Sequence, residues 1–455
     1  FLSRLPSELA LCILFALEDH VDVLAAAAVS RSWRRLALDG SVWRHLFFSH
    51  PGWAIREDAP LVLQHQAELR RIQIRAANLS ANYFAASLDW IKLYRDRFVL
   101  DQRWFSGKRA RGEDGVAKPF EPTRRYLCGH EDSVYCVRQD DGVGTGTSGK
   151  LVSGSRDRTI RIWDAESGEC RHILRGHTAS VLSLQYDDQI LVSGSSDSEV
   201  FVWDFAAIMA TPSGPRQEAG QKKADPVTHG RHRVLTKLRG HSSAVLDVAF
   251  DADWIVTSSK DASVRVWKRS DYSLYRKFTH GGPVNAVDLQ GGRIVTASGD
   301  GSMFLWDIEQ GSAIHAFQGH SKGLACISFR GDTVVSGSND QTIRIWNANT
   351  GRCRKVLQGH SELVRTVGYC PVRELVVSGG YDRAIKIWDA RTEDDRPDTQ
   401  PRISRTCLPI RDLKCHRARV FDIDLNTTRI VSASEDHSIC ISFFGGQGID
   451  TALFV

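Results

Sequence analysis

The chain has 455 residues, of which 42% are hydrophobic and 25% charged, a composition typical of globular proteins. Its longest uncharged apolar run, residues 9–17, is half the length that a membrane span needs, so we expect no membrane partner. Residues 1–125 hold 19 Lys and Arg against 14 Asp and Glu, which accounts for the whole net charge of +5. The neutral remainder argues against a nucleic-acid partner, because binding to phosphate backbones needs a basic stripe.

The ten cysteines are scattered and form neither C-x-x-C pairs nor zinc-type spacings with histidine. We therefore expect free thiols, no metal site and no cofactor, in a reducing compartment, the cytoplasm or the nucleus. Because the chain begins at Phe1 rather than Met, we also expect that a leading segment is missing.

A repeat of about forty residues fills the last two thirds of the chain. Its clearest copy, residues 176–204, reads GHTASVLSLQYDDQILVSGSSDSEVFVWD. Each copy has a histidine near its start and an aspartate in a later turn. The histidines are His130, His177, His241, His280, His320, His360 and His416. The aspartates are Asp157, Asp197, Asp261, Asp300, Asp340, Asp382 and Asp436. Seven copies with four short alternating strands each predict a seven-bladed β-propeller.

This pattern resembles the WD-repeat family. The resemblance implies a buried hydrogen-bonded network of histidine, Ser or Thr, aspartate and tryptophan in each blade. Six copies keep the tryptophan, whereas Ser442 stands in its place in the last copy. Seven equal copies also argue against a Ser-His-Asp nucleophile, since they cannot all be catalytic. We therefore expect a protein that is not an enzyme.

Residues 124–128 precede the first repeat and have no partner strand there, so we propose that they close the ring beside residues 440–444. The tail, residues 450–455, is the competing candidate for this strand. Three insertions, at residues 140–150, 206–233 and 391–405, all fall in a–b or c–d connections, which share one rim of a propeller. The opposite rim, built from d–a and b–c connections and called the upper rim below, is our candidate binding face.

One insertion contains a pattern close to a phosphate-binding loop, from Gly144 to Lys150. Leu151 stands where Ser or Thr would hold magnesium, and a strand rather than a helix is expected to follow. A nucleotide-hydrolysing function rests on this pattern alone.

The first 48 residues read as short amphipathic helices with more apolar surface than so small a unit can bury. The L-P-S-E-L start, the V-S-R-S-W-R-R-L centre and the V-W-R-H-L end resemble the F-box family. The resemblance implies docking on a Skp-type adaptor, which bridges to a cullin. The residues that match the docking motif are Leu5, Pro6, Leu9, Ile13, Leu14, Val29 and Trp33. The alternative is that these residues are the core of a small helical domain.

Residues 59–77 and 88–107 read as further helices. We therefore expect an F-box at residues 1–48, a helical linker or stalk at 49–123 and the propeller at 124–455. Whether these helices set a spacing or only pack as a core stays open.

Three residues per repeat are expected at the upper rim. The residues three positions after each histidine are Ser133, Ser180, Ala244, Pro283, Gly323, Leu363 and Arg419. Those five positions after it are Tyr135, Leu182, Leu246, Asn285, Ala325, Arg365 and Phe421. Those just before each turn aspartate are Arg156, Ser196, Lys260, Gly299, Asn339, Tyr381 and Glu435.

Arg365, Arg419 and Arg156 fall on consecutive blades of the expected ring, and Lys260 and Lys322 add further positive charge. Clustered arginines among hydroxyl and amide side chains suit phosphate, because a guanidinium donates two parallel hydrogen bonds to it. The alternative is that each arginine is a solvated charge or pairs with Glu435 or Glu362. The pattern predicts a surface for phosphorylated protein segments.

Residues 129–444 resemble the β-transducin-repeat-containing F-box receptors most, above all in GHSKGLACISFRGDTVVSGSNDQTIRIWN. Those receptors capture a doubly phosphorylated Asp-Ser-Gly degron. The resemblance carries their contact positions to Tyr135, Arg156, Ser180, Ser196, Asn285, Gly323, Ala325, Leu363, Arg365, Tyr381 and Arg419. Gly301 and Lys322 stand where that family has arginines, which predicts a weaker or altered phosphate geometry.

The sequence thus predicts the substrate receptor of a Skp–cullin–F-box ubiquitin ligase. The F-box would dock the machinery and the upper rim would hold a phosphorylated protein. The alternative is a WD-repeat scaffold that binds the adaptor without promoting ubiquitination.

Overall fold

The structure is a computed structural model that describes residues 7–17, 19–50, 53, 55, 89–105, 120–140, 149–210, 233–391, 408–446 and 449. The chain divides into two compact units, one of residues 1–106 with 443–455 and one of residues 107–442. The expected helix at residues 59–77 and most of the three insertions lie outside the described residues. In the part of the chain that is described, no helix has the length and apolar character to cross a membrane.

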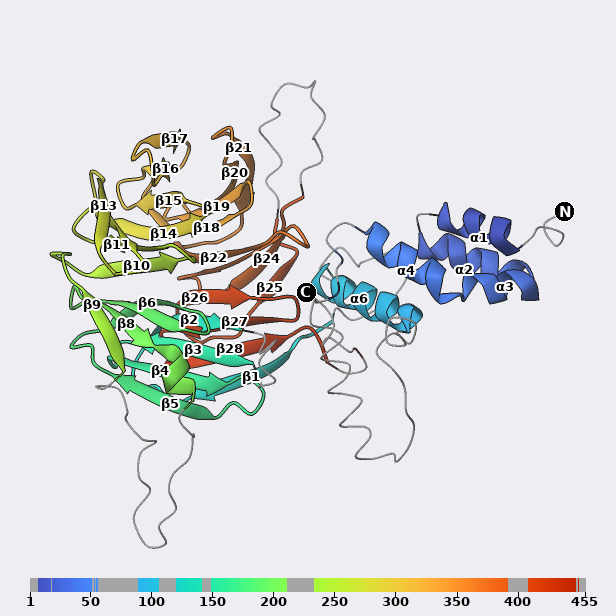
Figure 1. The fold of residues 1–455 in the computed structure, drawn as a ribbon, viewed down its shortest axis with the longest axis horizontal. Helices are drawn as coiled ribbons and strands as arrows, with labels where there is room; N and C mark the ends of the chain where they lie inside the picture. Colours follow the sequence, from blue (N-terminus) through green and yellow to red (C-terminus); the bar gives the residue numbers. More distant parts are fainter. Residues whose placement is uncertain are drawn as a thin grey trace, which may run out of the picture. The chain divides into compact units, whose positions relative to one another are not determined.

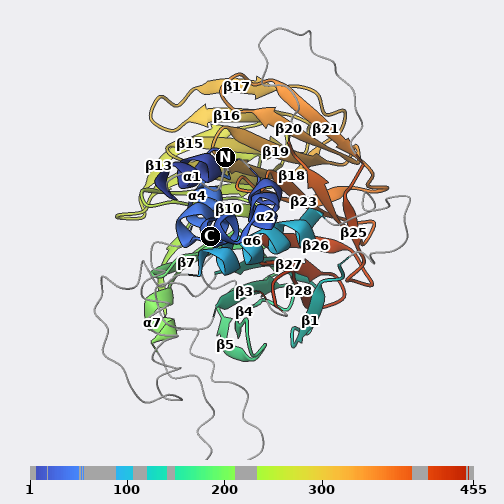
Figure 2. The same cartoon turned by 90° about the vertical axis from the view of Figure 1, so that its right-hand side faces the viewer.

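The first unit consists of short helices, coloured blue to cyan in Figures 1 and 2. They are α1 (Ser7–Phe15), α2 (His20–Val29), α3 (Arg31–Ala37), α4 (Gly40–Ser49) and α6 (Trp90–Phe105). Asp19, Ser30 and Asp39 cap α2, α3 and α4, because each side chain accepts a hydrogen bond from a backbone N–H of the first turn. The cap at Ser30 separates α2 from α3 without a loop, which keeps the unit small.

Aromatic side chains make up much of the core of this unit. The Trp43 indole donates to the carbonyl of Ala37 at 2.7 Å, and its ring packs edge-on to Tyr94 at 5.2 Å. Tyr94 also hydrogen-bonds His50 at 2.8 Å, so α6 is held against the short helices. Burial raises the pKa of Tyr94 to about 12. The helical interpretation of residues 88–107 is therefore realised as α6, which packs in the same core as the F-box helices.

The second unit is a ring of seven four-stranded antiparallel sheets (Figures 1 and 2). Blades 1 and 2 consist of β2 (Val134–Gln139), β3 (Lys150–Ser155), β4 (Thr159–Asp164), β5 (Cys170–Arg175), β6 (Val181–Tyr186), β7 (Ile190–Ser195), β8 (Val200–Asp204) and β9 (Val234–Leu238). Blades 3 and 4 consist of β10 (Val245–Phe250), β11 (Trp254–Ser259), β12 (Ser263–Lys268), β13 (Leu274–Thr279), β14 (Val284–Gln290), β15 (Arg293–Ser298), β16 (Met303–Asp307) and β17 (Ala313–Phe317).

Blades 5 and 6 consist of β18 (Leu324–Arg330), β19 (Thr333–Ser338), β20 (Thr342–Asn347), β21 (Cys353–Gln358), β22 (Val364–Cys370), β23 (Leu375–Gly380), β24 (Ile385–Asp389) and β25 (Arg411–Leu413). Blade 7 consists of β26 (Val420–Leu425), β27 (Arg429–Ser434), β28 (Ser438–Phe443) and β1 (Thr123–Cys128). A short helix, α7 (Phe205–Met209), follows β8. The seven-bladed propeller preceded by short helices is confirmed.

Blade 7 closes the ring with a strand from the other end of the repeat region. Its sheet runs in the order β1-β28-β27-β26, so the cyan β1 lies beside the red β28 (Figure 1). Leu127 is the buried residue of β1, with 3% of its surface exposed, and the Tyr126 hydroxyl donates to the carbonyl of Cys415 at 2.8 Å. The closure by residues 124–128 is confirmed.

Buried polar networks hold the blades together internally. In blade 1, His130 hydrogen-bonds Asp157 at 2.7 Å and Ser153 at 2.8 Å, and Trp163 donates to the same serine hydroxyl at 2.8 Å. Blades 2, 3, 5 and 6 repeat this arrangement. The network implied by the resemblance is therefore present in five complete copies.

Blades 4 and 7 depart from it. In blade 4, His280 approaches the Ser302 hydroxyl at 3.3 Å rather than Asp300, although its bond to Thr296 is kept at 2.9 Å. In blade 7, Ser442 replaces the tryptophan, and Cys415 replaces the glycine that packs against that ring in blades 1, 2, 5 and 6. Cys415 Sγ lies 3.6 Å from Ser442 Oγ. The larger residue on one side thus offsets the smaller residue on the other.

Side chains of one blade also satisfy the inner backbone of the next. Asp422 of blade 7 accepts from the backbone N–H of Val137 in blade 1 at 3.0 Å. Asp247 does the same for Val287 in the next blade at 3.0 Å. Innermost strands have no further strand to pair with, so these carboxylates supply acceptors that the sheets lack.

Ring closure predicts that Leu127→Ala lowers the free energy of unfolding by about 2–4 kcal/mol, because it opens a cavity beneath β1. The matched control is Leu235→Ala, since Leu235 lies on the outer strand β9 but is 50% exposed. That change should stay within about 0.5 kcal/mol. Urea unfolding of the full chain measures both, and equal effects would contradict closure by β1.

The seven turn aspartates predict a loss of stability in acid. For each of them burial acts to raise the pKa, but hydrogen bonds from neighbouring side chains and backbone N–H groups more than offset it, so the pKa is lowered from its usual value of 3.8. Their stabilisation is therefore present above pH 3.8 and lost as the pH falls below it. Thermal unfolding between pH 5 and pH 3 should show a steep fall in midpoint, and Asp157→Asn should make it shallower. A midpoint independent of pH in this range would contradict the network's role.

Candidate functional site

The upper rim is built from a backbone pairing that recurs in every blade. The residue before each turn aspartate donates its N–H to the carbonyl of the residue three positions after the histidine, at 2.8–3.0 Å. The pairs are Arg156 with Ser133, Ser196 with Ser180, Lys260 with Ala244, Gly299 with Pro283, Asn339 with Gly323, Tyr381 with Leu363, and Glu435 with Arg419. Two of the three residue sets expected at this rim are thus neighbours in space.

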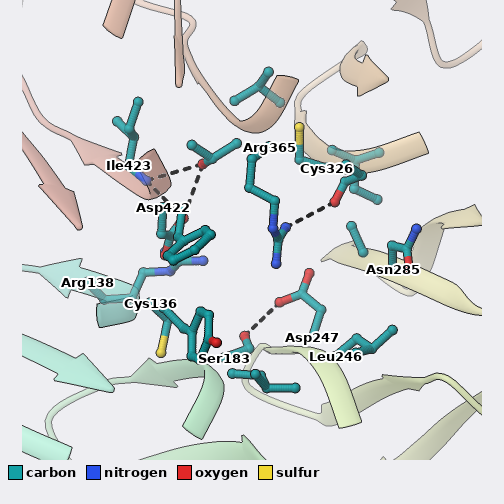
Figure 3. A pocket seen from close by; sticks show the side chains of 18 residues that line it. Cys136, Arg138, Ser183, Leu246, Asp247, Asn285, Cys326, Arg365, Asp422 and Ile423 are labelled. Carbon is teal, nitrogen blue, oxygen red and sulfur yellow. Dashed lines mark hydrogen bonds and ion pairs between the residues drawn. The ribbon is translucent and has the colours of Figure 1, made fainter. Parts of the chain in front are cut away.

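The third set lies on β-bulges. In each innermost strand the register shifts at the residue five positions after the histidine, so that residue has no partner opposite it. All seven bulge residues line one cavity of about 80 Å³ in the centre of the ring (Figure 3). A bulge re-aims a side chain out of the alternating pattern, which explains why these residues meet at the axis.

Arg365 is the central cation of this cavity. It lies on the bulge of β22, and its guanidinium extends into the middle of the opening, where it donates to the carbonyl of Ala325 at 3.3 Å (Figure 3). Among the described residues, no carboxylate oxygen lies within 4.0 Å of this guanidinium. Arg365 therefore has no ion-pair partner among the described residues, although Asp247 lies across the same cavity (Figure 3).

The other two arginines have carboxylates beside them. Arg156 Nε lies 3.6 Å from Asp132 Oδ2, and Arg419 Nε lies 4.0 Å from Glu435 Oε2. The guanidinium carbon of Arg419 also lies 4.7 Å from the centre of the Tyr381 ring. Of the pairings expected as the alternative, Arg419 with Glu435 is present, whereas the carboxylate beside Arg156 is Asp132, which was not expected there from the sequence.

An aromatic group joins blades 6, 7 and 1 beside these charges. The Phe421 ring lies 5.0 Å from Tyr135 and 6.1 Å from Tyr381, between centroids. Partial burial raises the pKa of Tyr135, and the charge of Arg156 acts in the opposite direction. Phe421 also lines the cavity. The sequence places it in the set of seven rim residues five positions after each histidine, but nothing in the sequence distinguishes it from the others as a contact residue.

The remaining expected residues have differing places. Lys260, Lys322 and Ser196 are exposed, Ser180 and Leu363 are partly exposed, and Ala325 is buried. The Asn285 amide already donates to the carbonyl of Leu324 at 2.7 Å. A Cβ on Gly323 would lie 2.3 Å from the carbonyl oxygen of Gly299, so this glycine is needed for the contact between blades 4 and 5. Its place in the site is thus a packing requirement.

Below the rim the cavity is lined by carboxylates and by a second guanidinium, that of Arg138, whose Nη1 lies 2.6 Å from Asp422 Oδ2. Asp247 accepts from the Ser183 hydroxyl at 2.7 Å, and Asp422 accepts from the Thr366 hydroxyl at 3.1 Å (Figure 3). Burial raises the pKa of Asp247 to about 6. Asp422 is thus paired with Arg138, whereas Asp247 lines the same cavity as Arg365 and has no ion pair among the described residues.

The residues expected to bind an adaptor fall into three groups. Ile13 and Val29 are exposed, at 43% and 63%, whereas Leu14 and Trp33 are buried in the helical core. Leu5 and Pro6, and the side chain of Leu9, lie outside what the structure describes. The core interpretation therefore holds for Leu14 and Trp33, which can shape a docking face but not touch a partner. The sequence motif does not separate the two roles.

Family models match both parts of the chain. A model described as F-box-like matches residues 2–49. The model of the WD domain, G-beta repeat, matches residues 121–164, 168–204, 232–268, 272–307, 311–347 and 351–389, which together make up just over half of the chain. The seventh repeat, with Ser442 for tryptophan and Cys415 for glycine, lies outside these segments, although the strand β1 that completes its blade lies within the first of them.

Two curated relatives match part of the chain. Mitochondrial division protein 1 of Pyricularia oryzae is 28% identical over 246 residues, which covers 44% of this chain and 36% of the relative. Nuclear distribution protein nudF of Aspergillus niger is 27% identical over 231 residues, covering 49% of this chain and 46% of the relative. The chain thus spans between a third and a half of the length of these relatives.

Among solved structures, the WD40 beta propeller domain of Doa1 is similar in fold. It superposes with a TM-score of 0.55 at 21% identity, over 70% of this chain and 96% of that domain. At this identity the likeness concerns the fold alone.

Proposed function

This chain belongs to the F-box and WD-repeat proteins, and on that premise we propose that it is the substrate receptor of a Skp–cullin–F-box ubiquitin ligase, with the upper rim binding phosphorylated protein segments. F-box domains bind Skp-type adaptors and WD40 propellers bind proteins, so an interaction role follows from the family itself. WD40 propellers are generally not catalytic, and the proposed role needs no chemistry from this chain.

The observation that carries the proposal is Arg365. The Arg365 guanidinium has no carboxylate within ion-pair distance and is half-enclosed at the mouth of a closed ring. Partial burial of a charged group is unfavourable unless an anion binds beside it. A phosphate there would accept charge-assisted hydrogen bonds, and the rings of Tyr135 and Phe421 would flank it.

The helical unit supports the other half of the role. Ile13, Val21, Leu24 and Val29 are all more than 40% exposed on α1 and α2. Large apolar side chains exposed together on a small domain usually mark a partner surface. We propose that this surface binds the Skp-type adaptor and, through it, a cullin.

In this arrangement the receptor accelerates ubiquitination only by proximity. It would hold the substrate and the ubiquitin-conjugating machinery on one particle, so that their encounter becomes intramolecular and their effective concentration rises. The resemblance to the β-transducin-repeat-containing receptors stays a prediction, as does a doubly phosphorylated degron.

A non-degradative scaffold is the second candidate function. The named relatives refer to mitochondrial division and nuclear distribution rather than to degradation. In that case the chain would bind the adaptor and a client protein without recruiting a cullin.

We also propose that the chain acts in the cytoplasm or the nucleus. All nine described cysteines are free thiols, and three of them, Cys12, Cys128 and Cys353, are exposed. Exposed free thiols suit a reducing compartment.

Arg365→Ala should weaken binding of phosphorylated peptides by about 1.5–3 kcal/mol, the scale of hydrogen bonds to charged groups. The measurement is retention of the full chain on a bead-bound peptide library with a fixed phosphoserine and random flanking residues. Arg156→Ala and Arg419→Ala should weaken retention less, since each arginine already has a carboxylate beside it.

The control for these variants is Arg330→Ala. Arg330 ends β18 at the opposite rim and pairs with Asp288 at 3.0 Å, so its removal changes the net charge equally without touching the upper rim. Equal losses of retention for Arg330→Ala and Arg365→Ala would show that the effect comes from the change in net charge and not from a site at the upper rim. Equal retention on phosphoserine and serine libraries would contradict phosphate recognition altogether.

Val29→Glu should abolish capture of the Skp-type adaptor, because it places a charge on an exposed apolar face without disturbing the core. The control is Lys92→Glu, an exposed site on α6 of the same unit. Affinity purification from cells, probed for the adaptor and a cullin, gives the readout. Adaptor with cullin supports the ligase role, and adaptor without cullin favours the scaffold.

A further inference from the structure

Two carboxylates of this chain lie beside the arginines of the upper rim. Asp132 faces Arg156 at 3.6 Å and Glu435 faces Arg419 at 4.0 Å, on neighbouring blades of the upper rim. The arginine side chains are 60% and 50% exposed and the carboxylates 38% and 41%. Both pairs are therefore open to solvent and to a ligand.

Such carboxylates have two opposite roles available to them. They can hold the guanidinium groups in position for a ligand, or they can bind the guanidinium groups themselves and so compete with the ligand. The first role would make each carboxylate necessary for binding, whereas the second would make each one an obstacle. The geometry of the two pairs separates these roles.

The position of Arg419 does not depend on Glu435. Its guanidinium stacks over the Tyr381 ring at 4.7 Å, and the distance to Glu435 is at the limit for an ion pair. Arg156 is more than half exposed, and Asp132 is fixed by its own loop, where it accepts from the N–H of Ser133 at 2.7 Å. Exposed ion pairs of this kind change an equilibrium by about fivefold at most. They are too weak to organise the rim and strong enough to compete with a ligand.

Both pairs belong to one electrostatic group. Partial burial is the main cause of the raised pKa of Tyr135; the charges of Asp132 and Glu435 act in the same direction and that of Arg156 in the opposite one. Arg419 adjoins this group through the Tyr381 ring, which contacts Phe421 beside Tyr135.

We propose that Asp132 and Glu435 act as built-in competitors, standing in for the ligand's anion at Arg156 and Arg419 and limiting the affinity of the upper rim. The inference rests on the proposed function. A phosphate carries close to two negative charges, so the two carboxylates oppose its approach more strongly than that of a ligand carboxylate. Arg365 is the one arginine of the three that offers its charge without this cost.

The test uses the full chain with Asp132→Asn, Glu435→Gln and both together. The probes are three bead-bound peptide libraries with the same random flanks and a fixed phosphoserine, glutamate or serine. Each single variant should raise retention on phosphoserine by up to about fivefold, and the double variant by more, because the pairs involve different arginines. Retention on glutamate should rise by a smaller factor and retention on serine should not change.

The matched control is Glu362→Gln. Glu362 is exposed beside Leu363 on the same rim, and no described basic side chain lies within 4.0 Å of it, so the variant changes the net charge without freeing an arginine. An equal rise in this control would overturn the proposal in favour of a general charge effect. Unchanged or reduced retention in the other variants, with unchanged unfolding midpoints, would also overturn it, since the carboxylates would then be supports.

The wild-type protein separates this inference from the proposed function. If it retains phosphoserine over serine but ignores the loss of Asp132 and Glu435, only the competitor role is wrong. If it retains all three libraries equally, phosphate recognition and the competitor role fall together.

Discussion

The pairing of β1 with β28 is the contact on which the rest of the propeller depends. A single blade is a small sheet with two faces to cover, and only a closed ring gives every blade a neighbour on both sides. Closure also brings β26 against β2, where Asp422 bonds the backbone of Val137. Without that junction Arg419 and Arg156 would belong to opposite ends of an open array and could not share one site.

The bulge in each innermost strand converts this scaffold into a binding surface. It frees one residue per blade from the alternation of the sheet and directs seven side chains towards the axis. Because the bulge is a feature of the repeat, the backbone is nearly the same in all blades and the side chains alone differ. Arg365 and Phe421 point to the axis because each stands at the bulge position of its blade. Different side chains at this position give the same fold different binding sites.

Charged side chains have different roles at the upper rim and on the inner strands of the propeller. The upper rim carries arginines and lysines, while carboxylates of the inner strands are used for bonds between blades. These inner carboxylates are needed because innermost strands lack a hydrogen-bonding neighbour, and one of them, Asp422, is also paired with Arg138. A propeller that is neutral overall can thus present a positive rim, and its own Asp132 and Glu435 moderate that rim where it is most basic.

Much of this architecture is determined by the sequence alone. The number of blades and the rim free of insertions follow from local patterns that recur at a fixed spacing, and a repeat that cannot bury its faces alone must stack. The sequence leaves residues 124–128 and 450–455 as candidates for the closing strand, and the pairing of β1 with β28 decides for the first. The F-box motif is equally local, although it does not separate the buried Trp33 from the exposed Val29. Other features are decided by tertiary structure, since they depend on residues far apart in the chain. The exchange of Cys415 and Ser442 in blade 7, the pairing of Arg156 and Arg419 with carboxylates and the isolation of Arg365 arise where loops from different strands or blades meet. Long charged side chains choose partners by distance in space, and no spacing along the sequence encodes that distance.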